Sequence, residues 1–106
     1  MQGKEVDIQL LRDEAENAES ARQMLRSARY RLTTVRDLFG GDHWGTSPEG
    51  QALKNSLLAV VDHRLAEVDQ LVAAAEKIAV GLAETADLEE KTEQEVGDSF
   101  RKVMPR

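Results

Sequence analysis

The feature that most constrains this fold is a short stretch, residues 38–50, that interrupts two long segments with a helical pattern. This stretch holds four of the seven Gly residues, one of the two Pro residues and the only Trp, Trp44. Gly closes helices because it accepts the left-handed backbone conformation that commonly follows the last helical turn. The pattern predicts two helices folded back on each other about a Gly-rich turn, an all-α antiparallel helix-turn-helix hairpin.

The first segment predicts a helix over about residues 4–39. No Pro or Gly lies between Lys4 and Gly40, so nothing in this segment interrupts a helix. A seven-residue apolar repeat keeps one stripe of a helix facing a partner helix. The repeat here consists of Leu11, Ala18, Leu25, Leu32 and Phe39.

After a turn over residues 40–47, a second helix is expected over about 48–93. Pro48 suits the first helical position and Glu49 the positive end of the helix dipole. Either Ser47 or Thr46 is available as the capping residue. Residues 1–95 therefore form one hairpin domain, and 96–106 are expected to be a flexible C-terminal tail. Alternatively, Phe100 and Val103 belong to a short amphipathic element that folds onto a partner.

The apolar face of the second helix is wider than a lone two-helix hairpin needs. A small single core supplies only about 3–5 kcal/mol, and association is a common remedy. The sequence therefore predicts dimerisation into a four-helix bundle, either as a homodimer or as a heterodimer with a similar hairpin. The residues assigned to this interface are Leu57, Val61, Leu65, Val68, Leu71, Ile78 and Leu82.

Composition excludes several classes of function. The net charge of −6 argues against nucleic acid, because binding phosphates requires clustered cations. With no Cys, disulfides and thiolate chemistry are excluded. No apolar run is long enough to span a membrane, and the start of the chain lacks the apolar region of a signal peptide.

No residue cluster predicts catalysis, a cofactor or a metal site. His63 and Glu67 lie four positions apart and share a helix face, but no motif supplies a third ligand. Ser residues occur without a nucleophile elbow, so we expect no enzymatic activity. Trp44 has two interpretations: an aromatic plug that closes the end of the helix pair, or an exposed recognition point.

Charge is unevenly distributed along the first helix. Its first half is acidic, whereas Arg22, Arg29 and Arg36 repeat every seven residues in its second half. These arginines either flank the helix seam in solvent or form a docking stripe for an acidic partner. A symmetric antiparallel dimer would set the acidic end of each subunit beside the Arg-rich end of the other, and a basic heterodimer partner would serve equally well.

In length, helix layout and central Trp44-Gly45, the chain resembles the small WXG-type proteins of type VII (ESX-like) secretion systems. The resemblance implies a helical hairpin that forms dimeric four-helix bundles. It also implies synthesis in the cytoplasm and export without a cleaved signal peptide, with a secretion ATPase as a further partner. The turn of that family is Trp-x-Gly, whereas here Gly45 directly follows Trp44.

That family also carries a C-terminal Tyr-x-x-x-Asp/Glu signal, and Leu88, Glu89 and Glu93 lie in the corresponding segment. Glu93 matches the acidic position, but Glu89 stands where the Tyr would be. The resemblance implies a secretion substrate or the partner hairpin that accompanies one. The alternative is a cytoplasmic coiled-coil scaffold module unrelated to secretion.

Overall fold

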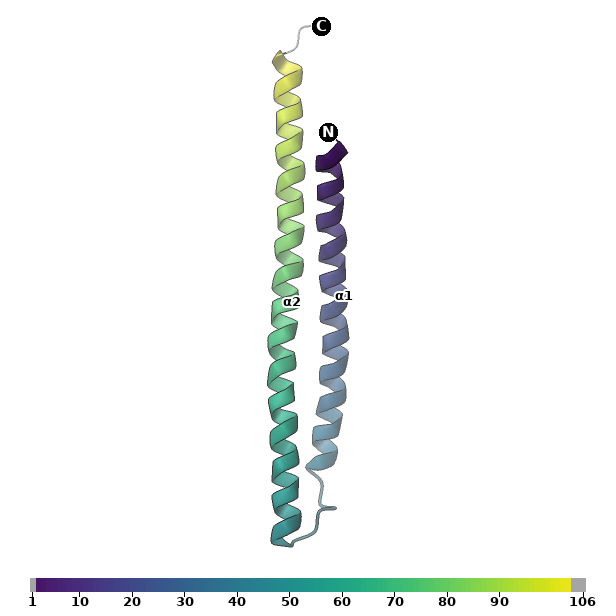
Figure 1. The fold of residues 1–106 in the computed structure, drawn as a ribbon, viewed down its shortest axis with the longest axis vertical. Helices are drawn as coiled ribbons and strands as arrows, with labels where there is room; N and C mark the ends of the chain where they lie inside the picture. The colour runs from purple at the N-terminus through teal and green to yellow at the C-terminus, as the bar shows by residue number, and fades with distance from the viewer. Residues whose placement is uncertain (1, 104–106) are drawn as a thin grey trace. The chain divides into compact units, whose positions relative to one another are not determined.

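The computed structural model describes residues 2–103, and the side chains of residues 7–103. These residues form two α-helices, α1 over Gln2–Phe39 and α2 over Pro48–Val103, joined by residues 40–47 (Figure 1). No strand occurs among them. The expected all-α class and helical hairpin are therefore confirmed for the described part of the chain.

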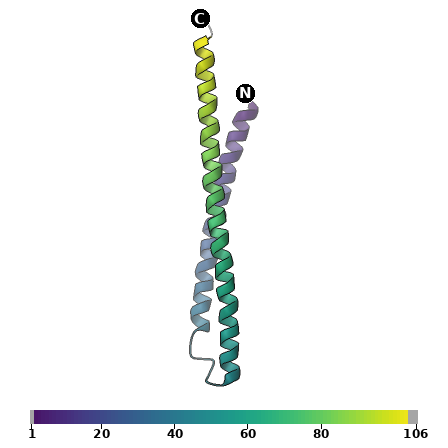
Figure 2. The same cartoon turned by 90° about the vertical axis from the view of Figure 1, so that its left-hand side faces the viewer.

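The chain divides into two compact units, each made of a segment of α1 and a segment of α2. Unit 1 comprises Met1–Ser20 and Glu76–Arg106, and unit 2 comprises Ala21–Ala75. In unit 2, Arg29 pairs with Asp69 and Arg36 pairs with Asp62, so the partner's number falls by seven as the number on α1 rises by seven. The two helical segments of this unit are therefore antiparallel, as Figures 1 and 2 also show.

Burial follows the seven-residue repeat in each unit. The least exposed apolar side chains are those of Ile8, Ala79 and Ala86 in unit 1 and of Val61 in unit 2. Among the side chains of residues 7–103, only Ala86 is completely buried, which reflects how little area two helices alone remove from water. The seam of each helix is the set of buried and half-buried positions that recur every three or four residues. On α2 the seam is Lys54, Leu58, Val61, Leu65, Val68, Val72, Ala75, Ala79, Leu82, Ala86, Glu89 and Glu93, and on α1 it is Ile8, Leu11, Ala15, Ala18, Arg22, Leu25, Ala28, Leu32, Val35 and Phe39.

The C-terminal part of α2 differs from the expectation. The sequence predicted a helix ending near 93 and a flexible tail over 96–106, but α2 continues through Val103. Within this segment Arg101 pairs with Asp98 one turn earlier, and Lys91 pairs with Glu95. Gly97 alone does not stop the helix, because an isolated Gly costs only about 1 kcal/mol relative to Ala. Residues 104–106 lie outside the described residues.

Candidate functional site

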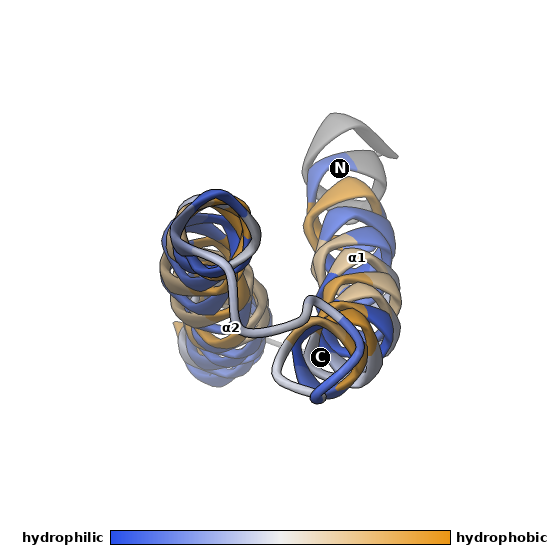
Figure 3. Ribbon diagram, turned by 90° about the horizontal axis from the view of Figure 1, so that it is seen from below, coloured by the Kyte–Doolittle hydropathy of each residue, from blue (hydrophilic) through white to orange (hydrophobic). Residues whose placement is uncertain are grey.

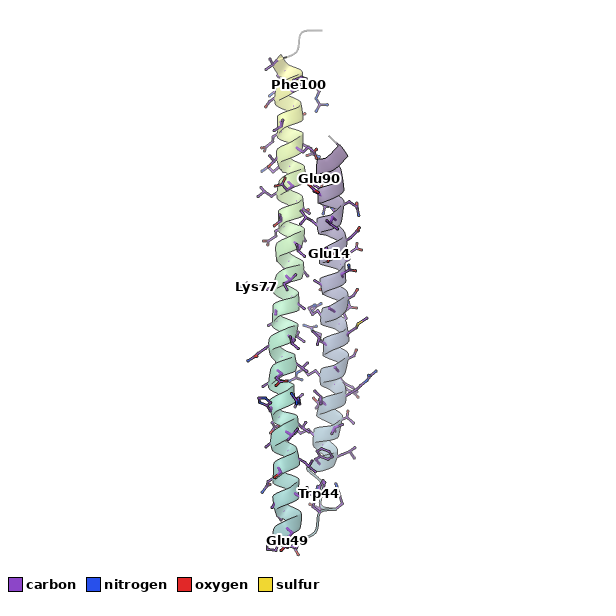
Figure 4. The ribbon with its side chains drawn as sticks, in the orientation of Figure 1. Glu14, Trp44, Glu49, Lys77, Glu90 and Phe100 are labelled. Atoms are coloured by element: carbon purple, nitrogen blue, oxygen red, sulfur yellow. The ribbon has the colours of Figure 1, made fainter. Side chains whose placement is uncertain are left out.

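The turn is organised around the indole of Trp44. Its Nε1–H donates a hydrogen bond of 2.7 Å to the backbone carbonyl of Phe39, the last residue of α1. The final carbonyls of a helix have no partner within the helix, so this bond satisfies one of them. The Phe39 ring meets the indole edge-on at a centroid distance of 5.9 Å, and the His43 ring lies 4.7 Å away on a tilted plane. Trp44, labelled in Figure 4, is therefore a half-buried cap on α1.

Two Gly residues fix the path of the chain around Trp44. Gly45 has a φ of 76°, the left-handed region that a side chain disfavours. A Cβ added to Gly50 would lie 2.2 Å from the Trp44 carbonyl oxygen, closer than any real contact. The Gly directly after Trp44 is thus required by the backbone of this turn, and Gly50 lets the turn approach the first turn of α2.

Ser47 begins α2. Its hydroxyl accepts a hydrogen bond of 3.0 Å from the backbone N–H of Gly50, three residues on, which is the geometry of a helix N-cap. Of the two capping residues that the sequence left open, the structure selects Ser47. The side chain of Gln51 donates a 2.6 Å bond back to the Gly45 carbonyl and ties the turn to the helix.

Each unit carries ion pairs along one edge, which we call the paired edge. The distances are 2.5 Å for Arg29–Asp69 and 2.5 Å for Arg36–Asp62 in unit 2, and Arg12 pairs with Asp87 and Glu90 in unit 1. These side chains are about half exposed, so the pairs set the antiparallel register more than they add stability. Arg29 and Arg36 are thus engaged within the hairpin and do not form a free docking stripe.

Three groups that form ion pairs, Arg12, Arg36 and Glu67, have shifted pKa values. Hydrogen bonds to Glu90 and then Asp87 raise the pKa of the Arg12 guanidinium, and the bond to Asp62 raises the pKa of Arg36. On α2, hydrogen bonding from Arg64 is the main reason that the pKa of Glu67 is lowered, with the neighbouring His63 contributing. All three shifts stabilise the charged forms that make the ion pairs.

The opposite edge of each unit carries exposed apolar side chains and is called the apolar edge. Successive residues of a helix are rotated by about 100°, so residues on either side of a seam position point to opposite edges. Asp62 and Asp69 of the paired edge directly follow the seam residues Val61 and Val68. Several residues that directly precede a seam position are instead apolar and more than half exposed, namely Leu10, Met24, Leu38, Leu53, Val60, Leu71, Ile78 and Leu88. Charged residues share this edge with them: Asp7, Glu14, Arg31, Arg64 and Glu67 also directly precede seam positions.

The apolar edge accounts for most of the large apolar side chains exposed among the described residues. Met24 is 73% exposed and Leu38 64% on α1, and Val60 is 57% and Leu71 53% exposed on α2. Figure 3 shows hydrophobic segments alternating with hydrophilic ones along both helices. The wide apolar face of α2 thus consists of two stripes. One stripe packs inside the hairpin, and the other is exposed among the described residues.

This division separates the residues that the sequence assigned to a dimer interface. Val61 is buried and Leu65, Val68 and Leu82 are half-buried at seam positions, so they pack within the hairpin. Leu71 and Ile78 lie on the apolar edge, and Leu57 also precedes a seam position but is half-buried. The structure therefore leaves only part of the assigned set available to a partner.

The expected C-terminal recognition segment is helical and lies in unit 1. Leu88 is 63% exposed on the apolar edge, whereas Glu89 and Glu93 are half-buried at seam positions. Glu93 also lines a shallow polar groove with Gln9 and Arg12. Beyond this groove Val96, Phe100 and Val103 continue the seam spacing and are 63–81% exposed; Figure 4 labels Phe100.

The one His–carboxylate pair expected from the sequence forms on α2. His63 Nε2 lies 2.9 Å from Glu67 Oε1, and Arg64 contacts the same carboxylate at 2.9 Å. Over residues 7–103, no group of three or more His, Asp or Glu side chains is arranged to hold a metal ion. Neither α1 nor α2, as far as they are described, contains a stretch long and apolar enough to cross a membrane.

Sequence reasoning missed the contribution of α1 to the exposed surface. Leu10, Met24 and Leu38 fall outside the seven-residue repeat of α1, so they were not assigned to any interface. The signal that would have identified them is their position directly before the repeat residues Leu11, Leu25 and Phe39.

In comparisons with known proteins, no protein-family model, no curated protein and no solved structure matches this chain.

Proposed function

We propose that this protein is a non-enzymatic, WXG-like helical hairpin that acts by helix–helix association, as a type VII secretion substrate or as the partner that accompanies one. The observation that carries the proposal is the apolar edge. Its large side chains, among them Met24, Leu38 and Leu71, are more than half exposed. Single exposed apolar residues are normal on a protein surface, whereas several of them grouped together mark sites of protein association.

The turn supports the same proposal. Trp44 caps α1 through the Phe39 carbonyl, and the Gly45 that follows has the backbone conformation only Gly adopts readily. A Trp-Gly pair is thus built into the hairpin as the element that closes it. This is the structural role that the resemblance to WXG-type proteins implies for it.

A second candidate is a cytoplasmic coiled-coil scaffold. It is favoured by the position of Glu89, which occupies the place of the Tyr in the family's C-terminal signal and is half-buried at a seam position. In a scaffold, the apolar edge would bind another helix of a cytoplasmic complex.

Export separates the two candidates. The full chain, carrying a short epitope tag, is expressed in a host with a functional type VII system and in the same host lacking the secretion ATPase. We expect the chain in the culture medium of the first strain and only in the cytosol of the second. A cytosolic enzyme assayed in the medium controls for lysis. Retention of the chain while a known substrate is exported would favour the scaffold.

Association is tested by co-purification with the product of the neighbouring gene. The variant Leu71→Gln changes the apolar edge, and Tyr30→Gln changes a side chain that is 75% exposed and away from it. We expect Leu71→Gln to reduce recovery of the partner at least severalfold and Tyr30→Gln to leave it unchanged. Equal recovery with both variants would contradict the assignment of this edge to binding.

A further inference from the structure

The turn holds a titratable side chain against the only Trp of the chain. The imidazole of His43 lies 4.7 Å from the indole of Trp44, centroid to centroid, and the two planes are tilted by 37°. At this distance two rings cannot lie side by side in one plane, so the imidazole lies toward the face of the indole. A cation over a Trp face and within about 6 Å of the ring centroid is attracted by the ring electrons. A proton gained by His43 therefore strengthens its contact with Trp44.

His43 also lies at the C-terminal end of α1. A Cβ added to Gly41 would be 3.1 Å from Nδ1 of His43, so the imidazole lies against the backbone that follows Phe39. The last carbonyls of a helix carry a partial negative charge, and a protonated His is stabilised beside them. This effect is independent of the indole and favours the same protonation state.

The charged groups around the turn act in the same direction. On the last turn of α1, in the joining residues and on the first two turns of α2, they are Arg36, Asp37, Asp42, Glu49 and Lys54. Arg36 is neutralised by its pair with Asp62 at 2.5 Å. Glu49, labelled in Figure 4, lies in the first turn of α2 and offsets the positive end of that helix. Three carboxylates and one ammonium remain, so the local charge favours a cation at His43.

Trp44 links His43 to the end of α1, because its indole donates to the Phe39 carbonyl and packs on the Phe39 ring. We propose that His43 makes this turn a proton-sensitive cap, which holds the end of α1 more firmly when the imidazole is charged than when it is neutral. Imidazole changes its charge between about pH 5 and 8, so the cap is firmest at mildly acidic pH. All of these residues lie in unit 2, and the inference is independent of export and of any partner.

The emission of Trp44 tests the contact directly, because no other Trp contributes. The full chain is titrated from about pH 8 to 5, across the range in which imidazole gains its proton, with excitation selective for Trp. A protonated imidazole in contact with an indole quenches its emission, so we expect the emission of wild type and of His63→Gln to fall. His43→Phe keeps a ring against Trp44 but has no proton to gain, and its emission should stay constant.

Urea unfolding at one protein concentration tests the effect on stability. Both chains compared carry His63→Gln, because His63 contacts Glu67 and has a pH response of its own. One of them also carries His43→Phe, and the equilibrium constant for unfolding is measured at about pH 5.5 and 8. The carboxylates that titrate are common to both chains, so the comparison isolates His43. We expect the constant to rise from the lower to the higher pH by a factor about two- to fivefold larger with His43 than in His43→Phe, which corresponds to an exposed cation–π contact.

Wild-type emission that stays constant over this pH range, or that falls equally in His43→Phe, would overturn the contact between the charged imidazole and the indole. Unfolding constants with the same pH dependence in both chains, or with a smaller rise when His43 is present, would overturn the proton-sensitive cap. Either result leaves the proposed function standing, because export and recovery of a partner are measured separately.

Discussion

At the scale of single residues, Trp44 has two structural tasks. Its indole packs against Phe39 and His43, and its N–H satisfies a carbonyl that the end of α1 leaves without a partner. Both contacts are local, within five residues of Trp44. The turn is therefore a small cluster that holds its shape through neighbours in sequence.

Replacing Trp44 separates the two tasks. Trp44→Ala removes the aromatic contacts and the hydrogen bond, and we expect a loss of about 2 kcal/mol in the free energy of unfolding, less than for a fully buried Trp. Trp44→Phe keeps an aromatic ring and should lose about 1 kcal/mol. Urea unfolding followed by circular dichroism measures both. Tyr30→Ala, at an exposed site, serves as the control and should change stability by less than about 0.5 kcal/mol.

Gly50 and Gly81 both lie within α2 but should respond oppositely to substitution by Ala. A Cβ at Gly50 would meet the Trp44 carbonyl oxygen at 2.2 Å, so Gly50→Ala must distort the turn and should destabilise the protein. A Cβ at Gly81 meets nothing within 4 Å, so Gly81→Ala should stabilise it by about 0.5–1 kcal/mol. Thermal unfolding of the two variants checks this, and a stabilising Gly50→Ala would contradict the close approach of the turn to α2.

At the scale of elements, each helix has three functional stripes. The seam packs inside the hairpin, several residues after seam positions form ion pairs, and several residues before them are apolar and exposed. One seven-residue repeat thus positions both edges, because the rotation per residue is fixed at about 100°. When α1 folds onto α2, the seam side chains are buried and the charged side chains of the paired edge form ion pairs, whereas the side chains of the apolar edge stay exposed.

The Arg64–Glu67 pair on α2 predicts a small acid-sensitive contribution to stability. The pKa of Glu67 is lowered by the hydrogen bond from Arg64, so the folded state binds its proton less readily than the unfolded state. This contribution is present above the ordinary Glu value of 4.5 and is lost as pH falls through the lowered pKa.

Carboxyl-carbon NMR titration measures this directly. In Arg64→Gln, whose partner cannot carry charge, we expect the pKa of Glu67 to rise toward the ordinary value. In Glu67→Gln, the urea midpoint should depend less on pH below 4.5 than in wild type. A Glu67 titration that is the same in wild type and Arg64→Gln would show that the pair does not persist in solution.

At the scale of the whole molecule, the core is small relative to the apolar surface left exposed. Ile8, Val61, Ala79 and Ala86 are the only buried apolar residues among those described, and two of them are Ala, which buries little area. A core of this size leaves a single chain marginally stable, so association is expected to contribute to folding.

The temperature of unfolding should therefore depend on protein concentration. Mass action stabilises a dimer by about 2.7 kcal/mol for each hundredfold rise in concentration. Between 1 and 100 µM, roughly the range accessible to calorimetry and circular dichroism, we expect the midpoint to rise by about 5–10 °C. A midpoint that does not change with concentration would indicate a monomer.

The two helices and the turn between them follow from the sequence alone. Breakers gather in residues 38–50, and the repeat through Leu25 and Leu32 spans the adjoining helix. Both signals are local, since helix ends and helical periodicity depend on residues within one or two turns. The end of α2 was misplaced because the apolar pattern fades after Ala86 while the helix continues to Val103.

How the apolar residues of α2 are used depends on the tertiary structure. Val61 and Leu71 look alike in the periodic pattern, but Val61 is 5% exposed and Leu71 is 53% exposed. Which of the two residues is buried depends on which side of α2 faces α1. That orientation is shown by contacts between residues far apart in sequence, such as Arg29 with Asp69. Periodicity along one helix carries no information about such a pairing, so the apolar edge could be recognised only once the two helices were placed together.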